Sequence, residues 1–247
     1  MSRRPDIAGG EHLPKLRPGQ EPPPPSWLPR QRRGTTPQMI GRYPDYDVFD
    51  AIDTWDEATK KAVLARLEPP GPLRFFTAEE EPTLRAFCDV ATAQDDEPRV
   101  PVAEMVDAKM ADAKLDGYRY ADMPRDPETW RRVLAGLDHT ARTAYRVPFA
   151  QATEEQRENI VREFAAGRLV GGPWDDLNVT RAWSVVMRGV LSEFYSHPWS
   201  WNEIGFGGPA YPRGFLRLGG PGREGPAVRE PFERPGAVDV DPVRKDA

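Results

Sequence analysis

Apolar side chains recur at helical spacing in six separate stretches of the chain. In each stretch they lie three or four positions apart, which places them on one face of an α-helix. No segment shows the alternation of β-branched residues that marks a strand. The pattern therefore predicts an all-α protein, an irregular bundle of about six short helices. The predicted helices begin near residues 54, 77, 101, 126, 153 and 178.

Capping signals mark the starts of these helices. In three places a threonine precedes a Glu or Gln by three residues, the spacing of a capping box in which each side chain accepts from the other's backbone N–H. Pro101 and Asp126-Pro127 place a proline in a first turn, and Asp176 or Asn178 can cap the last helix. The three capping boxes are Thr54 with Glu57, Thr77 with Glu80 and Thr153 with Gln156.

Proline is abundant, at 28 of 247 residues, and most of it lies outside the predicted helices. Because proline favours extended backbone, we expect residues 1–37, with the run Pro22–Pro25, to form a disordered or partner-wrapping arm. Residues 38–70 are expected to be an N-terminal extension with one helix, and residues 71–218 a helical domain. Residues 219–247 are expected to be a disordered tail.

An aromatic, Gly-rich and Pro-rich segment, residues 197–212, follows the last predicted helix. It is too apolar for a solvated loop and too interrupted for a helix, so we expect an irregular C-terminal loop. Rings in such a segment are buried either on their own bundle or on a partner. The candidate partner-interface residues are Tyr195, His197, Trp199, Trp201, Phe206, Tyr211 and Phe215.

Charge and hydropathy exclude some functions. The formal net charge is −5, which argues against binding nucleic acid through a basic face. No stretch approaches the roughly 20 apolar residues of a membrane helix, so we expect no direct membrane insertion. Twin arginines occur at Arg3-Arg4 and Arg32-Arg33 without the apolar stretch of a secretion signal. We therefore expect a cytoplasmic location, with export alongside a partner left open.

Catalytic and metal-binding patterns are not found in the sequence. His12, His139 and His197 are not at ligand spacing, and the single cysteine, Cys88, lies on an apolar helix face. The segment Gly205-Phe206-Gly207-Gly208-Pro209 lacks the Lys-Ser/Thr ending of a phosphate-binding loop. We therefore assign no catalytic, cofactor-binding or metal-binding residue to this chain.

Several short motifs stand out along the chain. They are Arg74-Phe75-Phe76-Thr77-Ala78-Glu79-Glu80, Gly136-Leu137-Asp138, Phe149-Ala150, Thr153-Glu154-Glu155-Gln156, Phe194-Tyr195-Ser196-His197-Pro198 and Ile204-Gly205-Phe206-Gly207-Gly208-Pro209. Together these motifs resemble the gluconate 2-dehydrogenase subunit 3 family. The resemblance covers roughly residues 70–218 and is clearest in its closing part. The segment from Gly41 to Leu67 looks like an N-terminal extension found in a subset of that family.

The resemblance implies a non-catalytic, chaperone-like helical subunit without a cofactor of its own. Members of the family pair with a large dehydrogenase of the glucose–methanol–choline type, sometimes with a cytochrome subunit as well. FAD and the catalytic groups then belong to the large subunit, which would oxidise a sugar, a sugar acid or an alcohol. Family members often carry a twin-arginine export signal, and this sequence departs from that feature.

Two alternatives remain from the residues alone. In the first, the chain is an enzyme whose polar groups meet only in three dimensions, around His197, Glu203 and Asp175. A deep pocket with strongly shifted pKa values would favour that reading. In the second, the chain is a helical scaffold that binds a protein other than a dehydrogenase.

Overall fold

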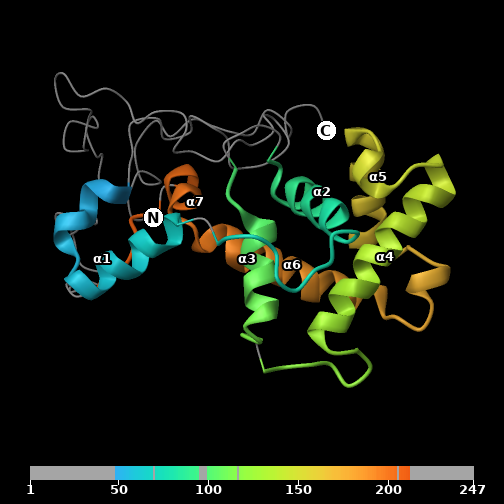
Figure 1. The fold of residues 1–247 in the computed structure, drawn as a ribbon, viewed down its shortest axis with the longest axis horizontal. Helices are drawn as coiled ribbons and strands as arrows, with labels where there is room; N and C mark the ends of the chain where they lie inside the picture. Colours follow the sequence, from blue (N-terminus) through green and yellow to red (C-terminus); the bar gives the residue numbers. More distant parts are fainter. Residues whose placement is uncertain (1–47, 69, 95–98, 116, 205, 212–247) are drawn as a thin grey trace, which may run out of the picture. The chain divides into compact units, whose positions relative to one another are not determined.

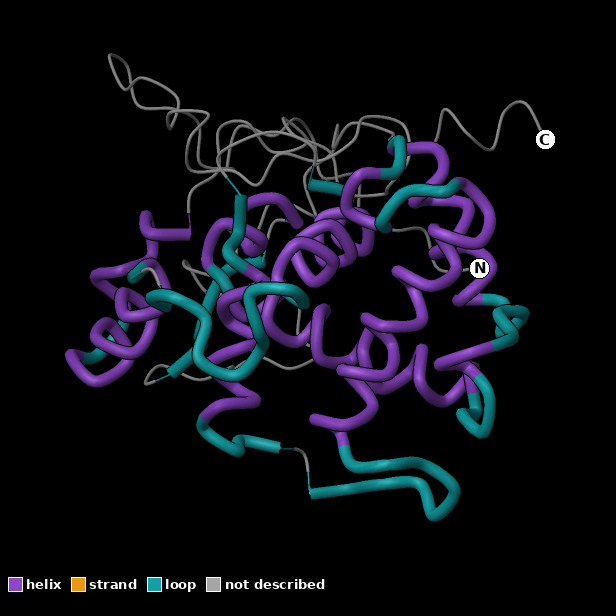
Figure 2. Tube along the Cα trace, turned by 45° about the vertical axis from the view of Figure 1, so that its right-hand side comes forward, coloured by secondary structure: helices purple, strands orange, loops and turns teal. Residues whose placement is uncertain are grey.

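The computed structural model describes residues 48–68, 70–94, 99–115, 117–204 and 206–211. These residues contain seven α-helices and no strand (Figures 1 and 2). The all-α class predicted from the sequence is therefore confirmed. The α-helices are α1 (Glu57–Leu64), α2 (Glu81–Thr92), α3 (Val102–Ala111), α4 (Asp126–Tyr145), α5 (Glu154–Ala165), α6 (Val179–Ser196) and α7 (Pro198–Ile204). The 3-10 helices are η3 (Val48–Thr54), η4 (Ala65–Leu67), η5 (Phe149–Gln151) and η6 (Gly172–Trp174).

The chain divides into two compact units. The first unit combines Met1–Glu68, Asp96–Val100 and Tyr195–Ala247, and the second combines Pro69–Asp95 with Pro101–Phe194. The first unit thus joins two parts of the chain that are far apart in the sequence. Among its described elements, α7 packs against η3.

The end segments expected from the sequence, residues 1–37 and 219–247, lie outside the described residues, as does Phe215. The domain boundaries proposed from the sequence stay a prediction.

Aromatic rings fill the centre of the second unit, where α2 packs against α3, α4 and α5. The ring centroid of Phe164 lies 5.0 Å from that of Trp174 and 5.2 Å from that of Trp183. Phe87 on α2 meets Trp130 on α4 edge-on at 6.3 Å and also packs against Phe164. Such ring pairs add about 0.5–1.5 kcal/mol each beyond the burial of their area.

Two of the predicted capping boxes are confirmed. The hydroxyl of Thr77 accepts from the N–H of Glu80 at 3.3 Å, and the Glu80 carboxylate accepts from the N–H of Thr77 at 2.9 Å. The Thr153 hydroxyl accepts from the N–H of Gln156 at 3.3 Å, and the Gln156 amide oxygen accepts from the N–H of Thr153 at 3.0 Å. The Thr153 box caps α5, whereas the Thr77 box closes the turn just before α2, which begins at Glu81 with Glu80 as its N-cap.

The third predicted capping box, at Thr54, is wrong. Thr54 lies in η3, and its hydroxyl donates to the carbonyl of Ala51 at 2.6 Å. Asp56 caps α1 instead, because its carboxylate accepts from the N–H of Thr59 at 2.8 Å. The chain before α1 already forms a 3-10 helix, and the Thr54 hydroxyl bonds to a carbonyl within that helix instead of capping α1.

The starts of α4 and α6 follow the sequence signals closely. Asn178 caps α6, since its side-chain oxygen accepts from the N–H of Arg181 at 3.2 Å. Asp176, the alternative, has φ of 61° and lies outside the helix. The sequence also indicated Asp126 as the cap of α4, but Asp126 is the first residue of the helix and Arg125 is its N-cap.

The expectation of a loop after α6 is wrong for Pro198–Ile204, which forms α7. The fixed φ of Pro198 suits a first helical turn. The Nδ1 atom of His197 accepts from the N–H of Trp199 at 3.2 Å, and the His197 carbonyl accepts from the N–H of Ser200 at 3.0 Å. A histidine is not among the usual capping residues, so Pro198 was the one sign of this start that the sequence offered.

Candidate functional site

The aromatic motif predicted as a partner interface lies in the first unit, at the end of α6, on α7 and in the segment after it. His197 and Trp201 are buried, while Tyr195 and Trp199 are half-buried. Phe206 and Tyr211 are exposed. Together with Phe215, which is not described, these residues stay predicted partner contacts. The buried residues, His197 and Trp201, make contacts within this chain.

Side chains satisfy the last carbonyl groups of α6. The indole N–H of Trp201 donates to the carbonyl of Tyr195 at 2.7 Å, and Arg66 donates to the carbonyl of Ser196 at 2.7 Å. The Arg66 guanidinium also lies 5.5 Å from the centroid of the Trp201 ring. A cation near a helix C-terminus and over an aromatic face is favourable on both counts. Trp201 and Arg66 therefore satisfy the carbonyl groups of Tyr195 and Ser196 at the end of α6.

His197 is structural rather than reactive in this setting. Its side chain is 2% exposed, and its ring meets that of Trp199 edge-on at 4.9 Å. Burial, and secondarily the positive charge of Arg66, lowers the pKa of His197 to about 4. The imidazole is therefore neutral at pH 7. Its Nδ1 lone pair accepts the N–H of Trp199, so the proton is on Nε2.

Trp201 anchors the residues that precede α1. It belongs to a buried cluster with Val48, Trp55 and Val63. Beside it, the amide oxygen of Asn202 accepts from the buried N–H of Val48 at 2.7 Å. The motif that was expected to contact a partner thus binds η3 and α1 of its own chain.

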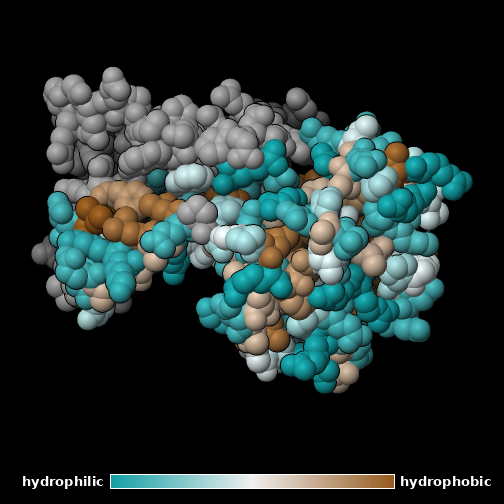
Figure 3. All heavy atoms as spheres, viewed as in Figure 1, coloured by the Kyte–Doolittle hydropathy of each residue, from teal (hydrophilic) through white to brown (hydrophobic). Residues whose placement is uncertain are grey.

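Large apolar side chains remain exposed in the same unit. Their exposed fractions are 43% for Leu64, 37% for Leu67, 42% for Phe206 and 64% for Tyr211. Figure 3 shows a hydrophobic group over η3 and α1, and further apolar patches lie among hydrophilic side chains over the second unit. The Phe206 ring packs edge-on against Trp201, with centroids 5.5 Å apart. These four residues form the exposed apolar set of the first unit. Phe206 and Tyr211 were predicted from the sequence as partner contacts, whereas the helical spacing of Leu64 and Leu67 had indicated burial beside Val63, which is wrong for these two leucines.

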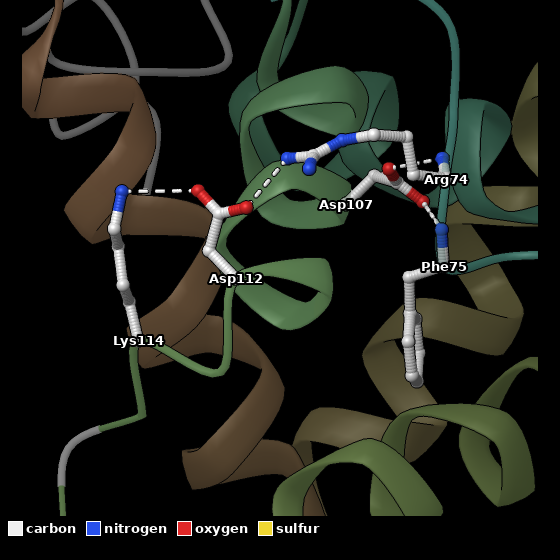
Figure 4. A network of polar contacts seen from close by, with 5 residues as sticks. All are labelled: Arg74, Phe75, Asp107, Asp112 and Lys114. Atoms are coloured by element: carbon white, nitrogen blue, oxygen red, sulfur yellow. Dashed lines mark hydrogen bonds and ion pairs between the residues drawn. The ribbon is translucent and has the colours of Figure 1, made fainter.

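A carboxylate that the sequence analysis missed, Asp107, holds the opening motif of the second unit (Figure 4). Asp107 lies on α3 and is 1% exposed. It accepts from the backbone N–H groups of Arg74 at 2.6 Å and of Phe75 and Phe76 at 2.9 Å. An acid on the buried face of α3, four residues after Ala103, was the available signal.

Arg131 on α4 holds the same motif from another side. Its guanidinium donates to the carbonyl of Phe75 at 3.0 Å and lies 4.7 Å from the centroid of the Phe75 ring. It also forms an ion pair with Glu80 at 3.5 Å. The Phe76 ring turns inward and meets Trp130 at 6.0 Å. Side chains from α3 and α4 therefore hold this motif in place directly before α2.

The motif Gly136-Leu137-Asp138 shapes the second unit in a similar way. A β-carbon at Gly136 would lie 2.5 Å from the Trp174 ring, so only glycine lets that ring approach α4. Asp138 accepts from the N–H of Phe149 at 3.0 Å and from Arg142 at 2.6 Å. These contacts explain the residue types in structural terms.

Other candidate chemistry finds little support. Burial raises the pKa of the Cys88 thiol, which stays protonated. Within the described ranges, no group of three or more His, Cys, Asp or Glu side chains could hold a metal ion. His197 and Asp175, two of the groups proposed to converge in an enzyme, belong to different units, and the Glu203 side chain is not described.

No described helix combines the length and the apolar character needed to cross a membrane.

Comparison with known proteins agrees with the resemblance seen in the motifs. No curated protein and no solved structure matched the chain. One family model matched, that of gluconate 2-dehydrogenase subunit 3, over residues 78–208, which is more than half of the chain. The match includes Asp107, Arg131 and Gly136 in the second unit and Trp201 in the first. The chain therefore belongs to the gluconate 2-dehydrogenase subunit 3 family, whose name describes a subunit of a dehydrogenase complex.

Proposed function

We propose that this chain is a non-catalytic accessory subunit that binds an FAD-dependent dehydrogenase and stabilises it. Membership in a family of dehydrogenase subunits supports this role. The observation that carries the proposal is the exposed apolar set of the first unit, Leu64, Leu67, Phe206 and Tyr211. Tyr and Phe are enriched at protein interfaces, where a few such residues dominate the binding energy.

The exposed apolar set rests on a scaffold that its own contacts hold in place. Trp201 and Arg66 satisfy the end of α6, and Asn202 ties the N–H of Val48 to α7. A surface that is already ordered loses less conformational entropy when it binds. The first unit is therefore suited to binding a protein partner.

The chemistry in this proposal belongs to the large subunit, which would carry FAD and oxidise a sugar, a sugar acid or an alcohol. In this proposal the chain holds no cofactor, and the packing of the two described glycines after α7 supports it. Gly207 and Gly208 are buried, and the space beside Gly208 is filled by Trp55 and Val48. The presence of a cytochrome subunit in the same complex stays a prediction. The location of this chain in the cell also stays a prediction.

An enzyme built around His197 is not favoured. A general base works best with a pKa near the operating pH and a free lone pair. The pKa of His197 is lowered to about 4, and its Nδ1 atom is occupied by the N–H of Trp199.

Co-expression with a large flavoprotein dehydrogenase from the same source tests the proposal. We expect a yellow complex to co-purify with this chain, and the double variant Leu67→Ser/Tyr211→Ser to lose most of the flavoprotein. Leu191→Ser is the matched control, because Leu191 is 38% exposed in the second unit. Co-purification of a protein without flavin would support a scaffold with another partner instead.

A further inference from the structure

A pocket of about 310 Å³ opens in the second unit beside the start of α4. It lies between the chain that follows α3 and the first residue of α4. At this volume it is at the small end of ligand sites and suits one or two side chains. Asp116 lies outside the described residues. The described lining residues are Leu115, Gly117, Tyr118, Arg119, Arg125 and Asp126.

The loop that forms one wall of this pocket is anchored to the start of α6. The Arg181 guanidinium lies 4.7 Å from the centroid of the Tyr120 ring and pairs with the Asp122 carboxylate. The side-chain amide of Asn178 donates to Asp122 at 3.2 Å. Tyr118 packs edge-on against Tyr120 with ring centroids 5.2 Å apart, yet it is 56% exposed. Tyr118 is therefore presented to solvent from an anchored loop.

Two arginines give the pocket its charge. Arg119 and Arg125 are both exposed. Neither side chain makes an ion pair or a hydrogen bond with any described residue, whereas Arg74, Arg131 and Arg181 are all paired. Asp126, at the first position of α4, is the acidic residue among the described lining. Two guanidinium groups with unused donors suit a carboxylate, which arginine binds through two parallel hydrogen bonds.

We propose that this pocket receives an acidic side chain from the surface of the dehydrogenase subunit, with Tyr118 packing beside it. The inference rests on the proposed function and adds a second contact, on the second unit. Exposed Tyr and Arg together are typical of the residues that dominate protein interfaces. The net charge of −5 disfavours nucleic acid as the source of the negative charge.

Binding of the purified flavoprotein to variants of the full chain tests the proposal. We expect Arg119→Gln/Arg125→Gln to raise the dissociation constant about tenfold or more at low salt, and Tyr118→Ser to raise it as well. The affinity of the wild-type chain should fall as salt is added, and that of the double variant should fall less. Arg146→Gln is the control, because Arg146 is also exposed and its side chain makes no ion pair or hydrogen bond with a described residue.

The outcomes separate the inference from the proposed function. If the wild-type chain does not bind the flavoprotein, both are overturned. If it binds and the double variant binds equally well, with the same salt dependence, only the pocket assignment is overturned. Binding of single-stranded DNA that the double variant abolishes, with flavoprotein binding unchanged, would also overturn the assignment.

Discussion

Gly208 lies so close to Trp55 that a β-carbon on the glycine would come within 2.7 Å of the indole ring. The same β-carbon would lie 2.9 Å from a methyl group of Val48. Gly208 ends the part of the chain matched by the family, whereas Val48 and Trp55 precede that part. This contact therefore joins the N-terminal extension to the closing motif of the family segment.

Substitution of Gly208 by alanine is expected to destabilise the protein by about 3 kcal/mol. The φ of Gly208 is +75°, which costs a residue with a β-carbon about 1–2 kcal/mol. The crowding against Trp55 adds a cost of about 1–3 kcal/mol for overpacking. The free energy of unfolding in urea measures the effect.

Gly71→Ala provides the control for backbone strain. Gly71 has φ of +84° and nothing within 4 Å of its β-carbon position. The free energy of unfolding of Gly71→Ala should therefore fall only by the cost of the backbone conformation, about 1–2 kcal/mol. Equal losses in the two variants would show that the contact between Gly208 and Trp55 is not tight.

His197 should make stability depend on pH in the acidic range. Its pKa is about 4 in the folded protein and 6.5 in an exposed histidine. Between these values the unfolded chain binds a proton that the folded chain does not, so stability falls as the pH drops from about 6.5 to about 4. The full loss is about 3 kcal/mol. Urea unfolding at a series of pH values measures it.

His197→Asn should remove this pH dependence, because its amide oxygen can take the place of Nδ1 as the acceptor from Trp199. His139, which is exposed on α4, is the control position. His139→Asn should retain the pH dependence of the free energy of unfolding that His197 produces. If the free energy of unfolding of His197→Asn fell with pH as it does in the wild-type chain, the pH dependence would belong to other groups.

Asp107→Asn should destabilise the second unit by about 2–4 kcal/mol. The carboxylate accepts three backbone N–H groups, whereas an amide has one acceptor oxygen and would turn an NH₂ group toward the remaining donors. Asp112→Asn is the control, since Asp112 pairs with Arg74 and Lys114 near the surface (Figure 4). Asp112→Asn should lower the stability much less than Asp107→Asn does. Thermal unfolding compares the two variants, and equal effects would contradict the role given to Asp107.

The sequence predicted well those features that depend on local chemistry. The boxes at Thr77 and Thr153 were found because a hydroxyl and its partner lie within one turn. Thr54 misled because η3 had already used its hydroxyl, and spacing alone does not show that. The family was recognised because its motifs are short and contiguous.

Features that depend on distant contacts were not predicted. Asp107 acts on Arg74–Phe76, more than thirty residues away. The start of α7 depends on a histidine side chain as acceptor, and Trp201 is buried by residues from before α1. Phe206 and Tyr211, two of the predicted partner contacts, are exposed. Their contact with a partner stays a prediction.

Gly136→Ala should destabilise the protein although it lies within α4. At an open helical site alanine is favoured over glycine by about 1 kcal/mol. Here its β-carbon would meet the Trp174 ring, whose N–H donates to the hydroxyl of Thr140 at 3.0 Å. We expect a net loss of about 1–3 kcal/mol in chemical denaturation. Gly189→Ala on α6, whose nearest ring atom is 3.1 Å away, should lose less, and a stabilised Gly136→Ala would contradict the packing described.

The thermal stability of the flavoprotein partner tests the central claim most directly. Release of FAD on heating, followed by flavin fluorescence, should occur at a higher temperature with this chain than without it, since a protein that binds the folded state stabilises that state. The flavoprotein alone should keep the catalytic activity, and this chain alone should have none. An unchanged release temperature, or substrate turnover by the isolated chain, would contradict the account.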